Sequence, residues 1–453
     1  MNIKINKGLD IPLGGKPERR VVDLRHSATR YAVRPVDVVG FTPRLLVAEG
    51  DSVAAGTPLV ADKRDPRLFL PAPVGGKVAA IVRGEKRKLL EVVVERSGAL
   101  SAENGGTRRL DADSPCWWML RERPFGTIAC PDHKPKGIFI SLLDTNPLAP
   151  DVLFALRDRM HDFEAGLAAL AALAPVHVCQ PAGADLKVNC AGVSVHTVEG
   201  PHPAGNIGTQ IAAISPINKG ECVWTALAQD VATMGHWLAT GLYEPERTVS
   251  VGGPAARSPH YYRVLCGSSL SLVSQAQLIN PAYPQPAEGG SGHTRIVSGS
   301  ALGGSATQAD GHLGMYDQQL TFLPEGDQYE FMGWLMPGLD KFSFSQTFLS
   351  GFLRHAEKLG VPSPAYRFNT NTHGSVRPFL FTGNFERVFP FDIYPMQLIK
   401  ACMVGDMELQ EQLGIYEVEP EDFALCEFID PSKTDIQTVI REALEALRKE
   451  AIA

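Results

Sequence analysis

Cysteine is the residue type best suited to hold an iron-sulfur cluster, and this chain contains eight cysteines. They stand at positions 116, 130, 179, 190, 222, 266, 402 and 426, so the closest pair is eleven residues apart. A zinc ribbon or a typical iron-sulfur site needs a local cluster such as CxxC, and the sequence has none. We therefore expect reduced core cysteines, and neither an iron-sulfur cluster nor zinc.

The glycine-rich segments at 200–208 and 251–254 are the candidates for a phosphate-binding loop. Neither contains G-x-G-x-x-G with an acidic residue about 20 positions later, and the chain has no Walker A motif. We expect no bound nucleotide and no flavin. His196 and His202 lie in or beside the first segment, but no third metal ligand is near them in sequence, so they are interpreted as polar loop residues.

Turn-forming residues divide the segment 46–81 into short apolar runs, which predicts a string of tight hairpins. This pattern resembles the barrel-sandwich hybrid of lipoyl and biotinyl carrier domains, in which a lysine on an exposed hairpin receives the cofactor. Lys63 stands close to that place. Pro71 follows it by eight residues instead of about six, and Pro66 stiffens the gap. Lys63 is therefore predicted to be an unmodified hairpin tip, and no covalent cofactor is expected.

Composition limits the class of protein. The chain has 453 residues and is 44% hydrophobic, which suffices for three or four domains with separate cores. Its net charge of -7, without any basic run, argues against nucleic acid as a partner. No segment reaches the roughly 18 uninterrupted apolar residues that cross a bilayer, and the amino terminus lacks a signal-peptide core. We expect a cytoplasmic protein without a transmembrane segment.

Further along the chain, strand and helix patterns alternate, which predicts an open, Rossmann-like α/β layer. Strands are expected at 137–143, 176–179, 221–224 and 247–251, and helices at 151–173, with Asp151 near the start, and 229–239. Short apolar runs at 261–266 and 294–298 favour a small β-rich domain. The last helix has apolar residues at helical spacing after Ser432-x-x-Asp435: Ile436, Val439, Ile440, Ala443, Leu444 and Leu447.

These patterns divide the chain into four predicted domains of an α/β multidomain fold. They are a lipoyl-like barrel-sandwich hybrid at 1–100, a Rossmann-like α/β domain at 101–254, a small β domain at 255–330 and a helical domain at 331–453. The Gly-, Ser- and charge-rich residues 97–113 are expected to form an exposed linker.

Several segments follow one another from end to end of the chain: INKGLD (5–10), RPF (123–125), LDTNPLA (143–149), GPHPAG (200–205), RIVSGS (295–300), NTNTHG (369–374), GNFERV (383–388), FDIYP (391–395) and GD (405–406). In this order they resemble the NqrA family of the sodium-translocating NADH:quinone oxidoreductase (Na+-NQR). The resemblance implies a fold similar to the flavoprotein subunit of complex I, with residues 255–330 as a soluble-ligand-binding β-grasp (SLBB) domain.

The resemblance also implies function and partners. Members of this family are soluble subunits on the cytoplasmic face of a bacterial membrane complex with five other subunits, NqrB to NqrF, and we expect the membrane protein NqrB to be the main contact. Electrons pass from NADH through flavins and iron-sulfur centres on other subunits. The NqrA family is linked with the end that reduces a quinone, ubiquinone or menaquinone, while sodium is exported. The alternative is a purely structural docking subunit, with the quinone site elsewhere.

Two segments combine the flat apolar walls and hydrogen-bond donors that a quinone needs, because its oxygens gain negative charge on reduction. The candidate quinone-binding residues in them are Phe41, Arg44, Trp117, Trp118, Arg123 and Phe125. The same residue types are enriched in cores and subunit interfaces, so that alternative stays open. His373 has a ring that could deliver a proton, but Thr372-His373-Gly374 is more typical of a hydrogen-bonded turn. No catalytic residue is assigned.

One prediction concerns NADH itself. The purified chain alone should not oxidise NADH, because it lacks a dinucleotide fingerprint. The check is the absorbance of NADH in the presence of a soluble quinone. Sustained turnover by this chain without other subunits would contradict the prediction.

Overall fold

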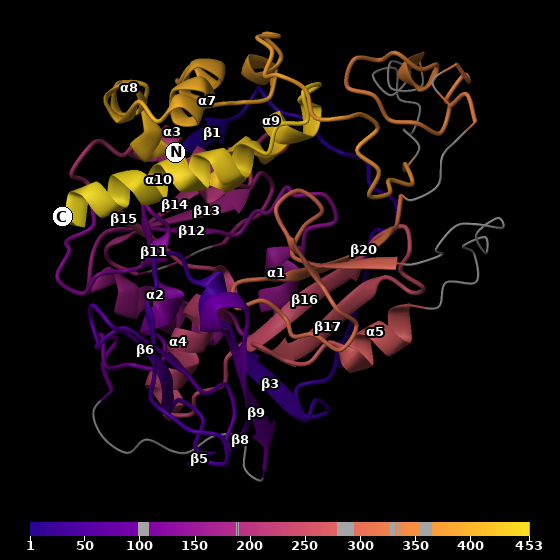
Figure 1. Cartoon of the computed structure of the whole chain (residues 1–453). Helices are drawn as coiled ribbons and strands as arrows, with labels where there is room; N and C mark the ends of the chain where they lie inside the picture. Colours follow the sequence, from indigo (N-terminus) through magenta and orange to yellow (C-terminus); the bar gives the residue numbers. More distant parts are fainter. Residues whose placement is uncertain are drawn as a thin grey trace.

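The computed structural model describes residues 1–97, 108–186, 188, 190–278, 294–326, 331–333, 335–352 and 365–452. These residues form four sheets and a C-terminal group of helices (Figure 1). Among them, no helix is both long and apolar enough to span a bilayer. The predicted linker at 97–113 lies mostly outside the described residues, which resume at 108.

Two small antiparallel sheets form the N-terminal module. Their strand orders are β3 (Arg30–Val33), β9 (Leu89–Arg96), β8 (Gly76–Arg83), β5 (Ser52–Val53), and β4 (Pro43–Leu45), β6 (Pro58–Asp62), β7 (Phe69–Pro71). Apolar residues of both sheets share one core, and Tyr31, Leu59 and Leu70 are fully buried in it. Antiparallel pairing of β6 with β7 confirms a hairpin predicted within 46–81, and β8 forms a further antiparallel pair with β9.

Lys63 is an exposed residue directly after β6, in the turn that leads to β7. Its backbone N–H donates to the carbonyl of Thr42 at 2.9 Å. The predicted position at a hairpin tip is confirmed.

The central sheet is the α/β layer. Its order is β1 (Asn2–Lys4), β14 (Val193–Glu199), β13 (Val176–Pro181), β12 (Ile138–Ser141), β15 (Val223–Thr225), β10 (Arg121–Arg123), β11 (Thr127–Ile128). The first five strands are parallel, and β10 and β11 are antiparallel additions at one edge.

Helices cover both faces of this sheet because side chains alternate along its strands. On β12, Ile138 and Ile140 share a core with α2 (Met160–Ala171) and α4 (Ala228–Thr240). Phe139, between them, shares a different cluster with Ile211 of α3 (Ile207–Ile214). This arrangement confirms the predicted Rossmann-like layer.

Two glycines let α2 and α4 pack backbone to backbone. A Cβ atom on Gly166 would lie 2.1 Å from the carbonyl oxygen of Val231, and one on Gly235 would lie 1.9 Å from that of Asp162. Real Cβ atoms do not approach so closely, so any larger residue at either position would push the helices apart.

The helix predicted at 151–173 is wrong in one respect, because it is two helices. Asp151 caps α1 (Val152–Leu156) by accepting a hydrogen bond from the Phe154 N–H at 3.0 Å, as its position near the start suggests. A turn at 157–159 then separates α1 from α2. The turn contains neither Gly nor Pro, so the apolar spacing runs on across it without a sequence signal.

The other large sheet has the order β19 (Ser305–Thr307), β18 (Thr294–Ser298), β20 (Gln319–Pro324), β16 (Glu246–Gly252), β17 (His260–Leu265), β2 (Glu18–Asp23), with α5 (Ser271–Gln277) packed beside it. The chain before residue 24 therefore supplies a strand here and another, β1, to the central sheet. Strand pairing crosses the predicted boundaries at 100 and 254.

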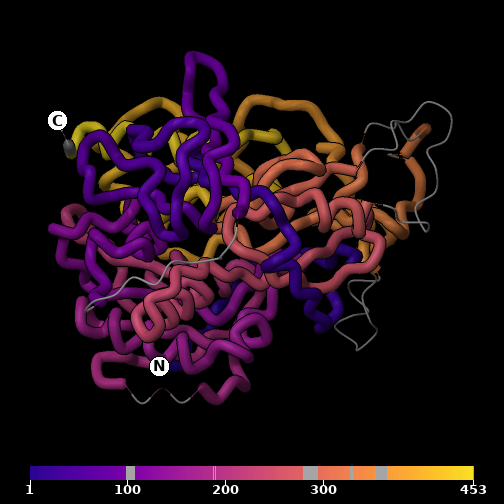
Figure 2. The backbone as a smooth tube through the Cα atoms, turned by 90° about the horizontal axis from the view of Figure 1, so that it is seen from below, coloured from indigo at the N-terminus to yellow at the C-terminus, as the bar shows by residue number. Residues whose placement is uncertain are grey.

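The six-stranded sheet lies directly beside the N-terminal module. An isolated bridge joins Tyr31 to Ser268, and the Ala32 N–H donates to the Gly267 carbonyl at 2.7 Å. Figures 1 and 2 both show the two units side by side.

The C-terminal residues form a second core of helices. These are α7 (Pro395–Val404), α8 (Met407–Gln412), α9 (Ala424–Ile429) and α10 (Ile436–Ile452). Short 3-10 helices complete the fold: η1 (Pro35–Asp37), η2 (Glu85–Arg87), η3 (Trp117–Met119), η4 (Phe385–Arg387), η5 (Ile415–Glu417) and η6 (Pro420–Phe423).

The start predicted for the last helix needs correction. Ser432 does not cap α10; Asp435 does, because its carboxylate accepts the Thr438 N–H at 3.2 Å. The backbone N–H of Ser432 donates instead to Asp430 at 3.0 Å, in the loop that precedes the helix. Ser-x-x-Asp contains two residues able to cap, and only the fold decides which one does so.

Candidate functional site

Arg123, one of the candidate quinone donors, lies in β10 and is buried, with 2% of its surface exposed. Its guanidinium contacts three acidic residues of the C-terminal helices. Nη2 is 2.6 Å from Glu421, Nη1 is 3.2 Å from Asp422, and Nε is 3.5 Å from Glu419. Every nitrogen of the guanidinium therefore lies within ion-pair distance of a carboxylate of this chain.

The carboxylates are held by the local structure of η6. Glu419 and Asp422 form a reciprocal capping box at its start, in which the Glu419 N–H donates to Asp422 at 2.9 Å. Burial alone would raise the pKa of Glu419, but the guanidinium of Arg123, with Arg121 and Arg441, lowers it below its usual value. Glu419 is thus held as a carboxylate beside these arginines.

This ionic cluster covers the first turn of α3. A Cβ atom on Gly208 would lie 2.5 Å from both Nη1 of Arg123 and Oδ2 of Asp422, and Asn206 donates to the Glu421 carbonyl at 3.2 Å. In dinucleotide-binding folds a phosphate lies at such a strand-to-helix turn. Here residues 200–206 do join β14 to α3, but side chains of the chain itself occupy that position.

His202 anchors the same loop. It is 1% exposed, its ring Nδ1 is 3.1 Å from the Thr145 hydroxyl, and its backbone N–H donates to Asp10 at 2.9 Å. Burial lowers the pKa of His202 to about 4, so the ring is neutral near pH 7.

The interpretation of His196 as a loop residue is wrong. It lies in β14 and is buried, with its Nε2 3.0 Å from Nδ1 of His177 on the adjacent strand β13. Burial lowers the pKa of both rings, so they share a hydrogen bond as neutral groups. The valines and the threonine on either side of His196 favour a strand, but the glycines nearby suggest a loop.

Trp117 and Trp118 are core residues, 5% and 2% exposed. The indole N–H of Trp117 donates to the Ala129 carbonyl at 2.8 Å, and its ring meets Trp224 edge to face at 5.5 Å. The indole N–H of Trp118 donates to the Tyr243 hydroxyl at 3.1 Å. Both tryptophans are therefore core residues, which is one of the alternatives that their residue type left open.

The other candidates, Phe41, Arg44 and Phe125, lie nearer the surface. Phe41 is half-buried and Arg44, on β4, is exposed. Gly40 contacts both Thr127 of β11 and Arg448 of α10, since a Cβ there would lie 3.0 Å from each side chain. Half-buried Phe125 contacts the same helix, because its carbonyl accepts from Arg441 at 3.2 Å.

Arg441 and Arg448 are two helical turns apart, roughly 10 Å along the axis at 1.5 Å per residue. The fold therefore brings the two predicted segments, around Phe41 and around Phe125, to neighbouring positions on one helix. Phe125 also meets the ring of Tyr416 at 6.3 Å, edge to face. Tyr416 and the α10 arginines come from a part of the chain that carries no sequence signal for this site.

His373 is an exposed turn residue with a positive φ of 48°. Its N–H donates to the Asn371 side chain at 2.7 Å, and the Thr372 hydroxyl donates to the Gly374 carbonyl at 2.9 Å. The prediction of a hydrogen-bonded turn is confirmed.

Comparison with known proteins assigns the chain to a family. A family model described as the NqrA N-terminal barrel-sandwich hybrid domain matches residues 3–97, and one described as the NqrA second alpha/beta domain matches 108–243. The A subunit of the Na(+)-translocating NADH-quinone reductase from Neisseria meningitidis serogroup B is 37% identical, over 99% of this chain and 100% of the relative. That of Pseudomonas aeruginosa is 36% identical with the same coverage.

This chain belongs to the NqrA family of the Na+-translocating NADH-quinone reductases. The resemblance inferred from the sequence is confirmed, as are the N-terminal barrel-sandwich hybrid and the α/β domain after it. The protein is a subunit of an oxidoreductase complex.

Among solved structures, a chain of an NAD+-reducing [NiFe]-hydrogenase in the H2-reduced state aligns over 70% of this NqrA chain and 55% of its own length. The TM-score is 0.32 and the identity 9%, values too low to support an argument from that likeness.

A stability prediction follows from the ionic cluster. Arg123→Leu removes the cation that buried Asp422 and Glu419 share and leaves Glu419 with Arg121, and breaking a buried ion pair typically costs about 3–5 kcal/mol. Arg295→Leu is the matched control, because Arg295 is 46% exposed and pairs with Glu325 at the surface, where an ion pair is worth about 0–1 kcal/mol. Urea unfolding of the purified protein measures both. Equal losses of stability in the two variants would contradict the role given to Arg123.

The neutral His202 gives a pH prediction. The unfolded chain binds a proton at this residue below about pH 6.5, whereas the folded chain does not until about pH 4. Its contribution to the free energy of unfolding is therefore present above about pH 6.5 and lost as the pH falls toward 4. His202→Gln should reduce the difference in stability between pH 7 and pH 4 by about 3 kcal/mol.

Urea unfolding of wild type and variant at both pH values provides the test. His161→Gln, at an exposed position of α2, is the control and should keep the wild-type pH dependence. An unchanged pH dependence in His202→Gln would show that this ring does not carry the effect.

Proposed function

We propose that this NqrA protein docks on the cytoplasmic face of a membrane complex, chiefly against the membrane protein NqrB and with four further subunits, and forms part of its quinone-reducing site. The names of its relatives supply the reaction class, since they describe a Na(+)-translocating NADH-quinone reductase. On this proposal NADH is oxidised on other subunits, and quinone reduction is coupled to sodium export.

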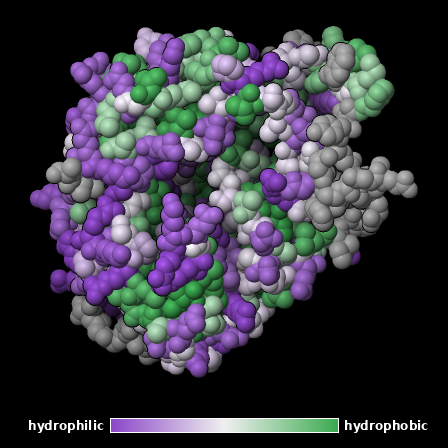
Figure 3. All heavy atoms as spheres, viewed as in Figure 1, coloured by the Kyte–Doolittle hydropathy of each residue, from purple (hydrophilic) through white to green (hydrophobic). Residues whose placement is uncertain are grey.

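Support for docking comes from an apolar surface on the C-terminal helices. Large apolar side chains are exposed on and beside α7 and α8: Tyr394, Met403, Val404, Met407 and Leu409. Figure 3 shows hydrophobic residues among hydrophilic ones along the top of the molecule, where these helices lie. Clustered exposed apolar residues are typical of contact surfaces. We propose this α7–α8 surface as the docking face.

Support for a quinone role comes from the junction of the N-terminal module and α10. Half-buried Phe41 and Phe125 offer flat apolar surface there, and the exposed guanidinium of Arg44 can donate to a quinone oxygen. Reduction places negative charge on that oxygen, and a positioned cation stabilises it. Trp117, Trp118 and Arg123 act behind these residues as supports, since they are buried and their polar atoms are already paired.

The observation that carries the quinone proposal is that both segments contact α10, one through Gly40 and the other through Phe125, in a chain whose relatives are quinone reductase subunits. The second candidate function is docking alone, which the α7–α8 surface favours. If the chain shapes a quinone site, substitutions at the junction of the N-terminal module and α10 should impair function. If it only docks, substitutions on the α7–α8 surface should do so.

The test replaces Arg44 by Leu in the assembled complex. Loss of one donor aimed at a developing oxyanion typically costs about 2.7–4 kcal/mol, and less where water competes, so quinone reduction should fall about tenfold to hundredfold. Reduction of an artificial acceptor by NADH should stay unchanged, because the flavin-containing subunits serve it.

Two variants control this experiment. Arg83→Leu removes an exposed arginine on the far end of β8 and should leave quinone reduction unchanged. Val404→Asp, on the α7–α8 surface, should lower the yield of complex without changing the turnover of what assembles. Normal quinone reduction in Arg44→Leu, with a loss of assembly in Val404→Asp, would reject the quinone role and leave docking as the function.

A further inference from the structure

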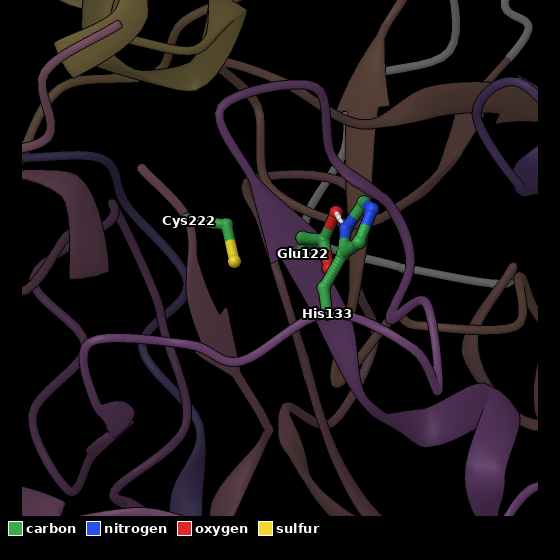
Figure 4. Close-up of side chains that lie close together, drawn as sticks. All are labelled: Glu122, His133 and Cys222. Carbon is green, nitrogen blue, oxygen red and sulfur yellow. Dashed lines mark hydrogen bonds and ion pairs between the residues drawn. The ribbon is translucent and has the colours of Figure 1, made fainter. Parts of the chain in front are cut away.

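A cluster of potential metal ligands lies at the edge of the central sheet, and it shares no residue with the junction of the N-terminal module and α10. Glu122 lies in β10, His133 follows β11, and Cys222 directly precedes β15. One ligand atom from each residue can be chosen so that all three lie within 4.8 Å of one another. Figure 4 shows the Glu122 carboxylate between the Cys222 sulfur and the His133 ring.

Hydrogen bonds fix the position of the Glu122 carboxylate. Its Oε2 accepts from the indole N–H of Trp224 at 2.9 Å and from the Cys130 N–H at 3.3 Å. Its Oε1 is 2.9 Å from Nδ1 of His133. Trp224 is itself held edge to face against Trp117, so the carboxylate is supported by the core.

The charge of Glu122 requires a partner. The residue is 7% exposed, and within the described part of the chain no lysine or arginine nitrogen reaches ion-pair distance of it. Its one ion-pair contact there is with His133, which is charged only when protonated. A buried carboxylate is costly without a compensating positive charge, so this position favours a bound cation.

The three donor types fit one class of metal. Thiolate sulfur, imidazole nitrogen and carboxylate oxygen together are typical ligands of Zn2+, which binds them at about 2.0–2.3 Å. Ligands on a common tetrahedral ion lie roughly 3–4 Å apart on these bond lengths. The three ligand atoms, which lie within 4.8 Å of one another, must therefore move slightly closer together to share one ion. Rotation of the half-exposed His133 ring can bring them closer.

We propose that Glu122, His133 and Cys222 form a binding site for a divalent zinc-type cation, with the fourth position open to water. Such an ion would tie the loop after β11 to the edge strands β10 and β15. The proposal revises the expectation of a chain without zinc, which rested on the absence of neighbouring cysteines. Glu122 and Trp224 are 102 residues apart, and only the pairing of β10 with β15 brings Cys222 to the carboxylate.

Cobalt(II) is the probe for this site, because a thiolate ligand gives the bound ion a sulfur-to-metal charge-transfer absorption. The full-length purified chain is first treated with a chelator and then titrated with Co2+. One equivalent should bind with that absorption, and Zn2+ should displace it. Cys222→Ser should abolish the charge-transfer band, and His133→Gln should lower the affinity by more than the roughly 10- to 100-fold typical for loss of an outer-shell partner.

Two further variants sharpen the result. Trp224→Phe keeps the apolar ring but removes the hydrogen bond to Glu122, and should lower the affinity by about 10- to 100-fold. Cys190→Ser removes a partly exposed thiol outside the cluster and should bind Co2+ like the wild type.

Thermal unfolding gives a readout independent of absorbance. Zn2+ should raise the Tm of the wild type and of Cys190→Ser, but not of Cys222→Ser or His133→Gln, because a ligand stabilises only the folded state that binds it. Circular dichroism without metal checks that each variant is folded. Two results would overturn the proposal: no stoichiometric Co2+ binding by the wild type, or binding that survives unchanged in both Cys222→Ser and His133→Gln.

Discussion

Burial of the Arg123 guanidinium is the constraint on which the arrangement of the C-terminal helices depends. A buried cation costs several kcal/mol unless anions and hydrogen bonds compensate it, and the three compensating carboxylates all come from residues 419–422. As long as Arg123 is buried, the central sheet and η6 must therefore stay in contact. The same contact covers the first turn of α3, which gives this α/β layer a closed end where related folds hold a phosphate.

Strand β10 gives different environments to its two faces. Side chains alternate along a strand, so Arg121 and Arg123 both reach Glu419, while Glu122 points away toward Trp224 and His133. One short strand thus joins the C-terminal helices on one side and carries the proposed metal ligand on the other. Gly40 and Phe125 contact α10 close to the side of β10 that joins the C-terminal helices. Gly40 touches β11, and β11 pairs with β10.

Local patterns predict much of this fold. Turn residues mark the hairpins of the N-terminal module, alternating strand and helix patterns mark the central sheet, and apolar spacing marks α10. The prediction fails where signals are ambiguous. The turn between α1 and α2 lacks Gly and Pro, and the glycines after Glu199 hide the fact that His196 belongs to a buried strand.

The site is harder to predict than the fold, because aromatic residues and arginines serve cores, interfaces and ligand sites alike. Trp117, Trp118 and Arg123 have the composition of a quinone site but form core contacts and an ionic cluster. The partners that decide this are distant in sequence; Asp422, for example, is 299 residues from Arg123. The cluster of Glu122, His133 and Cys222 is hidden for the same reason.

The most direct test of the account is a double-mutant cycle between Arg123→Leu and Asp422→Asn, measured by urea unfolding of the purified protein. If the guanidinium and this carboxylate hold the C-terminal helices on the sheet, the two losses should be strongly non-additive, with a coupling energy of about 1–3 kcal/mol. Losses that add to within about 0.5 kcal/mol would show that the two groups act independently, and would contradict the central role given to the buried arginine.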